Sequence, residues 1–151
     1  MIRRTMMYFA GVILLLAGIG SILYITNPTP RVPRIELTSL QDSPPPYVVK
    51  VHAQWCPVCI MTKDMWNQVQ QSYAGKVNLI VFDVTDAATE QASRAEAQRL
   101  GLGDFFDDNS GSTGTVYVLD GRTKALVTSI HGSRNFSDYS KPIDGALLAK
   151  K

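Results

Sequence analysis

Two cysteines, separated by only two residues, constrain the fold of this chain more than any other feature. The sequence WCPVC at residues 55–59 directly follows residues 47–53 (YVVKVHA), which have the β-branched content of a central strand. Residues 57–73 then place large apolar side chains at helical spacing, and residues 77–84 (VNLIVFDV) have the composition of a second buried strand. A strand, a helix and a strand in this order predict a right-handed crossover between parallel strands. The cysteines are therefore expected where the first strand meets the first helix.

The rest of the domain continues with further regular elements. A helix, two strands and a helix are predicted, in that order, at residues 87–100, 115–119, 125–130 and 140–149. Gly101 ends the first of these helices, and residues 120–124 form the turn of a β-hairpin. Ser140 is expected to cap the last helix, with Pro142 in its first turn. The predicted fold class is α/β, with a central mixed sheet flanked by helices.

One long segment, residues 103–114 (GDFFDDNSGSTG), shows no regular pattern and is either a functional loop or a place where the element assignment fails. Its acidic residues do not alternate as the ligands of a calcium loop do, so a solvated loop is favoured. Phe105 and Phe106 either contribute to a docking surface beside the active site or pack in the core. The sequence leaves both alternatives open.

The positions of Cys56 and Cys59 favour redox chemistry. Cys56 falls at the cap of the predicted helix, where unpaired N–H groups and the helix dipole should stabilise a thiolate on an exposed sulfur. Pro57 fits the first helical position, and Cys59 follows one turn later, close enough to attack a mixed disulfide on Cys56. The alternative is an inert structural disulfide. A four-residue ring would stabilise the fold by only about 2 kcal/mol, against about 3 kcal/mol for a fifteen-residue loop, so the redox interpretation is favoured.

The WCPVC motif between a hydrophobic strand and a helix resembles the active-site motif of the thioredoxin superfamily. The resemblance covers about residues 47–149 and is greatest to membrane-anchored, exported thioredoxin-like proteins of bacteria, which exchange disulfides in the periplasm. It implies that Cys56 is the nucleophile and Cys59 the resolving thiol. Trp55 and Pro57 would then be substrate-facing or tuning residues. No organic cofactor is implied, because the cysteine pair itself carries two electrons. The implied partners are exported protein thiols or disulfides and a redox partner of unknown identity.

Two positions differ from the pattern of that family. A cis-proline usually precedes the first strand of the family's hairpin, whereas this chain has Gly114 there. We therefore expect the peptide bond between Thr113 and Gly114 to be trans. Thioredoxins proper also bury an acid in the strand before the motif, and the corresponding residue here is Lys50. Gly114 is thus a further candidate for shaping the surface on which a substrate lies.

The two histidines offer a tuning group and a different function. His52 should share a strand face with Lys50, either as a packing or hydrogen-bonded residue or as an imidazole that tunes the thiolate. His131 ends the predicted hairpin and is expected at the surface. In the alternative function, a metal-binding or metal-delivery module, Cys56 and Cys59 hold copper or zinc together with His52 or His131. A structural zinc site needs four converging ligands, and the sequence does not show that either histidine converges, so we predict no metal site.

The N-terminus carries an uncharged, mostly apolar run at residues 6–25 (MMYFAGVILLLAGIGSILYI). As a helix this run would be about 30 Å long, which is enough to cross a bilayer. Arg3 and Arg4 favour a cytoplasmic location for residues 1–5. A cleaved signal peptide is the alternative, but the run is long for one, and its best cleavage motif at residues 18–20 lies inside it. The sequence therefore predicts an uncleaved transmembrane anchor.

Residues 26–46 separate this anchor from the predicted domain and hold six of the eight prolines of the chain. Proline favours extended backbone, so the segment is expected to be a linker, within which residues 34–40 alternate as an edge strand would. Residues 47–151 then form the thioredoxin-like domain. The predicted location is the bacterial inner membrane, with a single pass and the domain in the periplasm.

The distribution of charge disfavours nucleic acid as a partner. The formal net charge is +2, but the four arginines closest to the N-terminus all precede the first acid, Glu36, so the remainder of the chain is slightly acidic. No basic stripe interleaved with aromatic residues is present in the sequence. Nucleic-acid binding is therefore not predicted.

Overall fold

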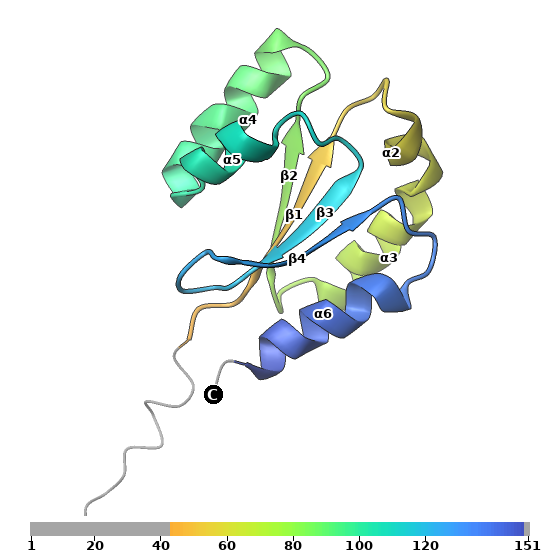
Figure 1. Ribbon diagram of the computed structural model, residues 1–151, viewed down its shortest axis with the longest axis vertical. Coiled ribbons are helices and arrows are strands. Elements are labelled where there is room, and N and C mark those ends of the chain that lie inside the picture. The colour runs from red at the N-terminus through yellow and green to blue at the C-terminus, as the bar shows by residue number, and fades with distance from the viewer. Residues whose placement is uncertain (1–42, 150–151) are drawn as a thin grey trace, which may run out of the picture. The chain divides into compact units, whose positions relative to one another are not determined.

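The computed structural model describes residues 43–149, in which a four-stranded mixed sheet lies between two layers of helices (Figure 1). The strand order is β2-β1-β3-β4. The strands are β1 (Tyr47–His52), β2 (Asn78–Asp83), β3 (Thr115–Leu119) and β4 (Leu126–His131). β1 pairs with β2 in parallel and with β3 antiparallel, and β3 and β4 form an antiparallel hairpin. The predicted mixed sheet and its parallel first pair are confirmed.

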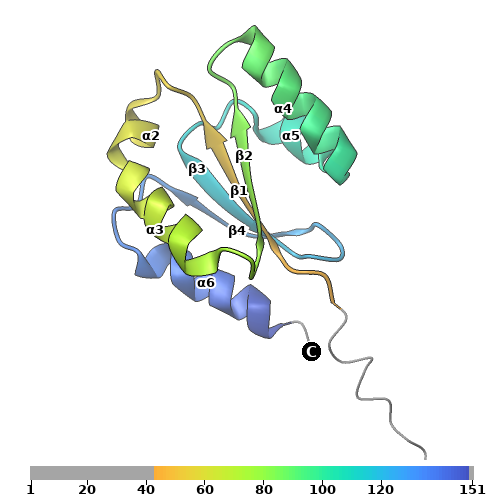
Figure 2. The same ribbon diagram turned by 180° about the vertical axis from the view of Figure 1, so that it is seen from behind.

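The helices cover both faces of the sheet. The first face carries α2 (Pro57–Met61), α3 (Lys63–Tyr73) and α6 (Ser137–Leu148), and the second carries α4 (Ala87–Leu100) and α5 (Gly103–Asn109), as Figure 2 shows from behind. Successive side chains of β1 alternate between the two layers. Val48 joins the core beneath α3 and α6, whereas Val49 and Val51 join the core beneath α4 and α5. This alternation places Lys50 and His52 on the α3 side.

The predicted helix at residues 57–73 is in fact two helices, because the backbone departs from helical geometry at Thr62. The Thr62 hydroxyl donates a 2.7 Å hydrogen bond to the carbonyl of Val58, one turn earlier. Such back-bonding by threonine bends helices. The break lets α2 carry the cysteines at the end of the sheet while α3 packs along it.

Of the two alternatives for residues 103–114, the loop is wrong for the first half, which forms α5. Phe106 is buried and meets Phe82 edge to face, with ring centroids 5.2 Å apart, while the acidic side chains of α5 stay outside. Phe105 is partly buried against Tyr117, at 5.1 Å between ring centroids. Core packing therefore accounts for both aromatic residues.

The last helix begins at Ser137, three residues before the predicted cap. The Asn135 side chain accepts a hydrogen bond from the Ser137 N–H, and Tyr139, in the first turn of the helix, is buried in the core. Ser140 consequently lies within the helix rather than at its cap. Pro142 lies in the interior of the helix rather than in its first turn.

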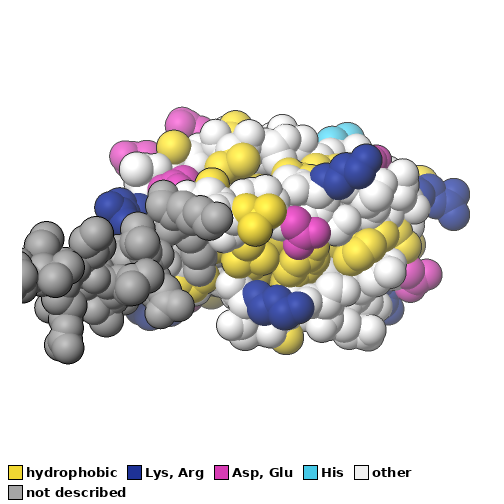
Figure 3. Space-filling model, turned by 90° about the horizontal axis from the view of Figure 1, so that it is seen from below, with side chains coloured by type: hydrophobic (Ala, Val, Ile, Leu, Met, Phe, Trp, Pro, Cys, Tyr) yellow, Lys and Arg dark blue, Asp and Glu magenta, His cyan; other side chains and the backbone are white. Residues whose placement is uncertain are grey.

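The beginning of the described region joins the domain directly. Pro46 is fully buried, and its carbonyl accepts a 2.9 Å hydrogen bond from the N–H of Asn78. The predicted anchor at residues 6–25 and edge strand at residues 34–40 lie outside the described residues. Within residues 43–149, none of the helices combines the length and the apolar character needed to span a bilayer. On the face drawn in Figure 3, basic and acidic side chains are interspersed with hydrophobic ones.

Candidate active site

The two cysteines lie at the start of α2, at the end of β1. Cys56 is the N-cap residue, with extended backbone, and Pro57 occupies the first turn. The sulfur of Cys56 accepts a hydrogen bond from the backbone N–H of Cys59, at 3.2 Å. Both thiols are free, and only 3% of Cys56 and 2% of Cys59 is exposed. The expected exposed sulfur on Cys56 is therefore wrong, because Gly114 closes over it.

The pKa values of the two thiols move in opposite directions. Burial raises the pKa of Cys56, but hydrogen bonds from the Cys59 thiol, the Thr113 hydroxyl and nearby backbone N–H groups outweigh it, so the net change is downward. Burial raises the pKa of Cys59, and its hydrogen bond to Cys56 raises it further. The pair therefore holds one thiol that is more acidic than an ordinary cysteine and one that is less acidic, which suits a two-step exchange.

Thr113 is a residue of the site that the sequence did not indicate. Its hydroxyl hydrogen-bonds to the sulfur of Cys56 and lowers the pKa of that thiol. It lies in the connection between α5 and β3, far from the motif along the chain. Only its place next to Gly114 in the sequence hinted at proximity to the cysteines.

Gly114 contacts the cysteine turn with its backbone. All peptide bonds within residues 43–149 are trans, which confirms the expectation for the bond between Thr113 and Gly114. The φ angle of Gly114 is +83°, a conformation that favours glycine. Its N–H donates a 2.9 Å hydrogen bond to the carbonyl of Val51. The amide that a proline would lack thus pairs with β1 of this chain.

Trp55 and Pro57 lie at the surface around the buried sulfurs. Trp55 is 62% exposed, and its Nε1 donates a 2.9 Å hydrogen bond to the carbonyl of Thr85, which follows β2. The backbone N–H of Gln54 donates to the Thr85 hydroxyl at 3.0 Å. These two bonds fix the exposed indole beside Cys56.

Comparison with known families identifies the domain. Residues 37–107, which include the cysteine motif, match the family model described as thioredoxin. The chain belongs to the thioredoxin superfamily. No curated protein matches its sequence. In general terms, the thioredoxin-like fold and the paired Cys56 and Cys59 are those of a thiol-disulfide oxidoreductase.

Solved structures that are similar to this superfamily member include the following three. A thioredoxin-like protein, solved in solution in its oxidised form, is 16% identical with a TM-score of 0.49, over 72% of this chain and 82% of the other. Trxlp from Edwardsiella tarda EIB202 is 20% identical with a TM-score of 0.42, over 69% of this chain and 86% of the other. A thiol:disulfide interchange protein of the thioredoxin family from Chlorobium tepidum TLS is 21% identical with a TM-score of 0.47, over 73% of this chain and 83% of the other.

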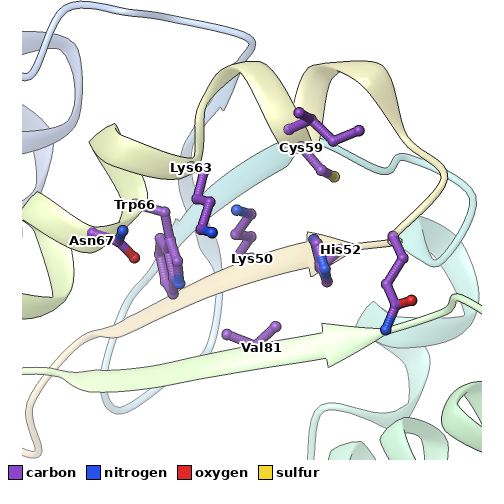
Figure 4. Close-up of a pocket in the computed structure, with 9 residues that line it drawn as sticks. Lys50, His52, Cys59, Lys63, Trp66, Asn67 and Val81 are labelled. Atoms are coloured by element: carbon purple, nitrogen blue, oxygen red, sulfur yellow. The ribbon is translucent and has the colours of Figure 1, made fainter.

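Lys50 and His52 of this thioredoxin-like domain line a pocket together with Cys59 (Figure 4). Lys50 is buried, and its amino nitrogen stands 5.5 Å from the ring centroid of Trp66. Burial lowers the pKa of Lys50, against the opposite effect of the two cysteines. Burial also lowers the pKa of His52, and the charge of Lys50 lowers it further. The prediction that the two residues share one face is confirmed.

His131 does not join this group. It is exposed at the end of β4, where its Nδ1 forms a 2.9 Å hydrogen bond with the Thr115 hydroxyl. In the described part of the chain, no three His, Cys, Asp or Glu side chains are placed so that they could hold one metal ion. The geometry therefore gives the metal-binding alternative no support.

Proposed function

We propose that this protein is an exported, membrane-tethered thiol-disulfide oxidoreductase that exchanges disulfides with other exported proteins. The observation that carries the proposal is the 3.2 Å hydrogen bond from the Cys59 N–H to the Cys56 sulfur at the start of α2. This contact, together with the opposite pKa shifts of the two thiols, supports a separate role for each cysteine. The pair itself carries both electrons, so the proposal requires no organic cofactor.

The reaction proceeds in two balanced steps. The Cys56 thiolate attacks one sulfur of a substrate disulfide, so a mixed disulfide forms and the other substrate sulfur leaves as a thiolate. Cys59 then loses its proton and attacks the Cys56 sulfur, which releases the second substrate thiolate and leaves a disulfide between Cys56 and Cys59. The substrate gains two electrons, and the cysteine pair loses them. The same steps in reverse oxidise a substrate dithiol, and the reduction potential of the pair sets the direction.

Substrate contact is assigned to the surface around Cys56. The buried sulfur is reached beside the exposed Trp55 and Pro57, while Gly114 covers it from the side of β3. An exposed indole offers a large apolar surface at low entropic cost, which suits an extended or unfolded protein segment. The proposed substrates are therefore protein cysteines rather than a bound cofactor.

The proposed location rests on the sequence before the domain. Residues 6–25 are uncharged and long enough to cross a bilayer, and Arg3 and Arg4 precede them. These features favour a single-pass protein of the bacterial inner membrane with the thioredoxin-like domain in the periplasm. A disulfide-exchange domain suits that oxidising compartment.

A redox titration of the full-length chain tests the activity. After equilibration in glutathione buffers of graded potential, alkylation and mass measurement should reveal one two-electron transition, with a tenfold change in the ratio of the two forms for about 30 mV. The protein should also accelerate disulfide exchange in a model protein substrate, whereas Cys56→Ala should not. Equal rates for the wild type and Cys56→Ala would contradict the proposal.

A further inference from the structure

A pocket of about 460 Å³ opens beneath Cys59, between β1, β2 and the helices α2 and α3. Lys50 and His52 enter it from β1, and Lys63 enters it from α3 (Figure 4). Trp66, Ile60 and Val81 supply apolar walls, and no lining residue is acidic. This volume lies within the usual range of small-molecule sites, which combine apolar walls with a few polar groups.

No carboxylate pairs with the positive charges of this pocket in the described part of the chain. Only 4% of Lys50 is exposed, yet its amino group makes no hydrogen bond or ion pair with any residue in 43–149. Lys63 likewise has no ion-pair partner there, and Figure 4 shows the amino groups of both lysines in the space between β1 and the helices. Buried charges are ordinarily paired. An anion in the pocket would supply the missing partner.

A second polar group on the same wall also lacks a partner. The Nδ1 atom of His52 is buried without a hydrogen bond, the one such side-chain atom found among residues 43–149. The acid paired with His52 across the strands, Asp83, uses its Oδ1 to accept hydrogen bonds from the N–H and the hydroxyl of Thr85 and makes no hydrogen bond to His52. The two groups without a hydrogen-bond partner, the amino group of Lys50 and Nδ1 of His52, therefore belong to residues that line the same pocket.

The geometry points to a ligand site in this pocket for an organic carboxylate with a compact apolar body. The carboxylate would lie between the amino groups of Lys50 and Lys63, where charge-assisted hydrogen bonds are available. The apolar body would pack against Trp66 and Val81. A bare inorganic anion would leave these walls without a partner, and an uncharged molecule would leave the lysines without one. This site lies beside the redox pair but is separate from the substrate surface around Trp55.

Burial of Lys50 is consistent with such a ligand. Without an anion, desolvation lowers the pKa of this amine, and the thiols of Cys59 and Cys56 act in the opposite direction. A carboxylate in the pocket would favour the charged ammonium and would add to that opposing effect. The ligand and the proton on Lys50 would therefore stabilise each other.

Indole N–H NMR signals of the full-length chain provide the test, because its two tryptophans report on different places. Trp66 lines the pocket, whereas the exposed Trp55 does not and serves as the internal control. Phenylacetate should shift the Trp66 signal saturably and leave the Trp55 signal unchanged. Phenylacetamide, which has the same body without the charge, should cause no saturable shift. Inorganic phosphate should bind at least about tenfold more weakly than phenylacetate.

Matched lysine variants identify the site. Lys50→Met should weaken phenylacetate binding at least about tenfold, and the exposed Lys63→Gln should weaken it by a smaller factor without a cost in folding. Lys76→Gln, in the turn after α3 and outside the pocket, should bind as the wild type does. Three results would each overturn the inference. The first is a Trp66 signal that phenylacetate does not shift, and the second is binding of phenylacetamide or phosphate as tight as that of phenylacetate. The third is binding of phenylacetate by both Lys50→Met and Lys63→Gln that is as tight as in the wild type. The test involves no thiol chemistry, so its outcome is independent of the proposed redox function.

Discussion

A Cβ atom at position 114 would lie 2.6 Å from Cγ1 of Val58, which is closer than real Cβ contacts allow. The backbone of Gly114 therefore packs directly against the turn between the two cysteines, with no space for a side chain. The same hypothetical atom would be 3.5 Å from the Cys56 sulfur. The close approach explains why the sulfur is buried although its residue caps a helix. It also places the Thr113 hydroxyl within hydrogen-bonding reach of that sulfur.

Gly114→Ala should destabilise the protein for two separable reasons. Alanine resists the positive φ angle, and its methyl group would collide with Val58. Together these effects should lower the free energy of unfolding by about 2 to 4 kcal/mol. Chemical denaturation of the full-length chain measures the loss.

A double-mutant cycle with Val58→Ala separates the two causes of that loss. Removing the Val58 methyl groups should reduce the cost of Gly114→Ala by about 1 kcal/mol or more, while the backbone strain remains. If the two substitutions changed the free energy of unfolding by strictly additive amounts, the collision with Val58 would not contribute to the loss of stability.

Cys56, rather than Cys59, should form the long-lived mixed disulfide. Hydrogen bonds lower the pKa of Cys56 and burial raises that of Cys59, so Cys56 should react at least about tenfold faster with an alkylating probe at neutral pH. Cys59→Ala should accumulate mixed disulfides with substrate proteins, visible on non-reducing gels, and Cys56→Ala should not. Faster alkylation of Cys59 would reverse the assigned roles.

Thr113→Val should make Cys56 less acidic. The substitution keeps the shape of the side chain but removes the hydroxyl that hydrogen-bonds to the sulfur, so the pKa of Cys56 should rise. The pH midpoint of Cys56 alkylation should move upward, and the rate at neutral pH should fall several-fold. Thr115→Val is the matched control, because the Thr115 hydroxyl pairs with His131 instead. Equal midpoints in the two variants would rule out the assigned role of Thr113.

Elements with strong local signals could be predicted from the sequence. α4 has the predicted bounds because a capping box at Asp86 begins it and Gly101, with φ of +67°, ends it. α5 was missed because its two phenylalanines stand among acids and turn-forming residues, so no apolar periodicity is visible in seven residues. Burial of Phe106 against Phe82, a tertiary contact, stabilises α5.

The chemistry of the site could be predicted only as far as it is local. Cys56, Pro57 and Cys59 lie within one turn, so their spacing alone indicated a capped helix with two thiols. Thr113 and Gly114 come close to Cys56 only when β3 pairs with β1. No local pattern in the sequence predicts this contact. The loss of the family's proline was visible in the sequence, but the hydrogen bond from Gly114 to Val51 was not.

The chain should remain in the membrane through residues 6–25. The length of the apolar run and the arginines before it predict an uncleaved anchor. After carbonate washing, the protein should stay in the membrane fraction, and the mass of the purified native protein should include these residues. A soluble mature form that begins near Ser21 would contradict the tether but would leave export intact.

Lys50→Met should stabilise the protein in a pH-dependent manner. Burial holds the pKa of Lys50 below its ordinary value of 10.5, so between the two values the unfolded chain binds a proton that the folded chain lacks. The stability of the wild type therefore rises as the pH rises through this window and is lowest at its acidic end. Methionine fills a similar space without a charge and should raise the free energy of unfolding at neutral pH by roughly 1 to 3 kcal/mol.

The gain from Lys50→Met should shrink as the pH approaches 10.5, because the unfolded chain then also loses the proton. Denaturation curves of both proteins across this range measure the difference. The comparison is best made with both cysteines replaced by alanine, since the thiols of Cys59 and Cys56 raise the pKa of Lys50 and would mask part of the effect. A gain that did not vary with pH, or a variant less stable than the wild type throughout, would show that Lys50 is not strained by burial and that its charge is balanced in the free protein.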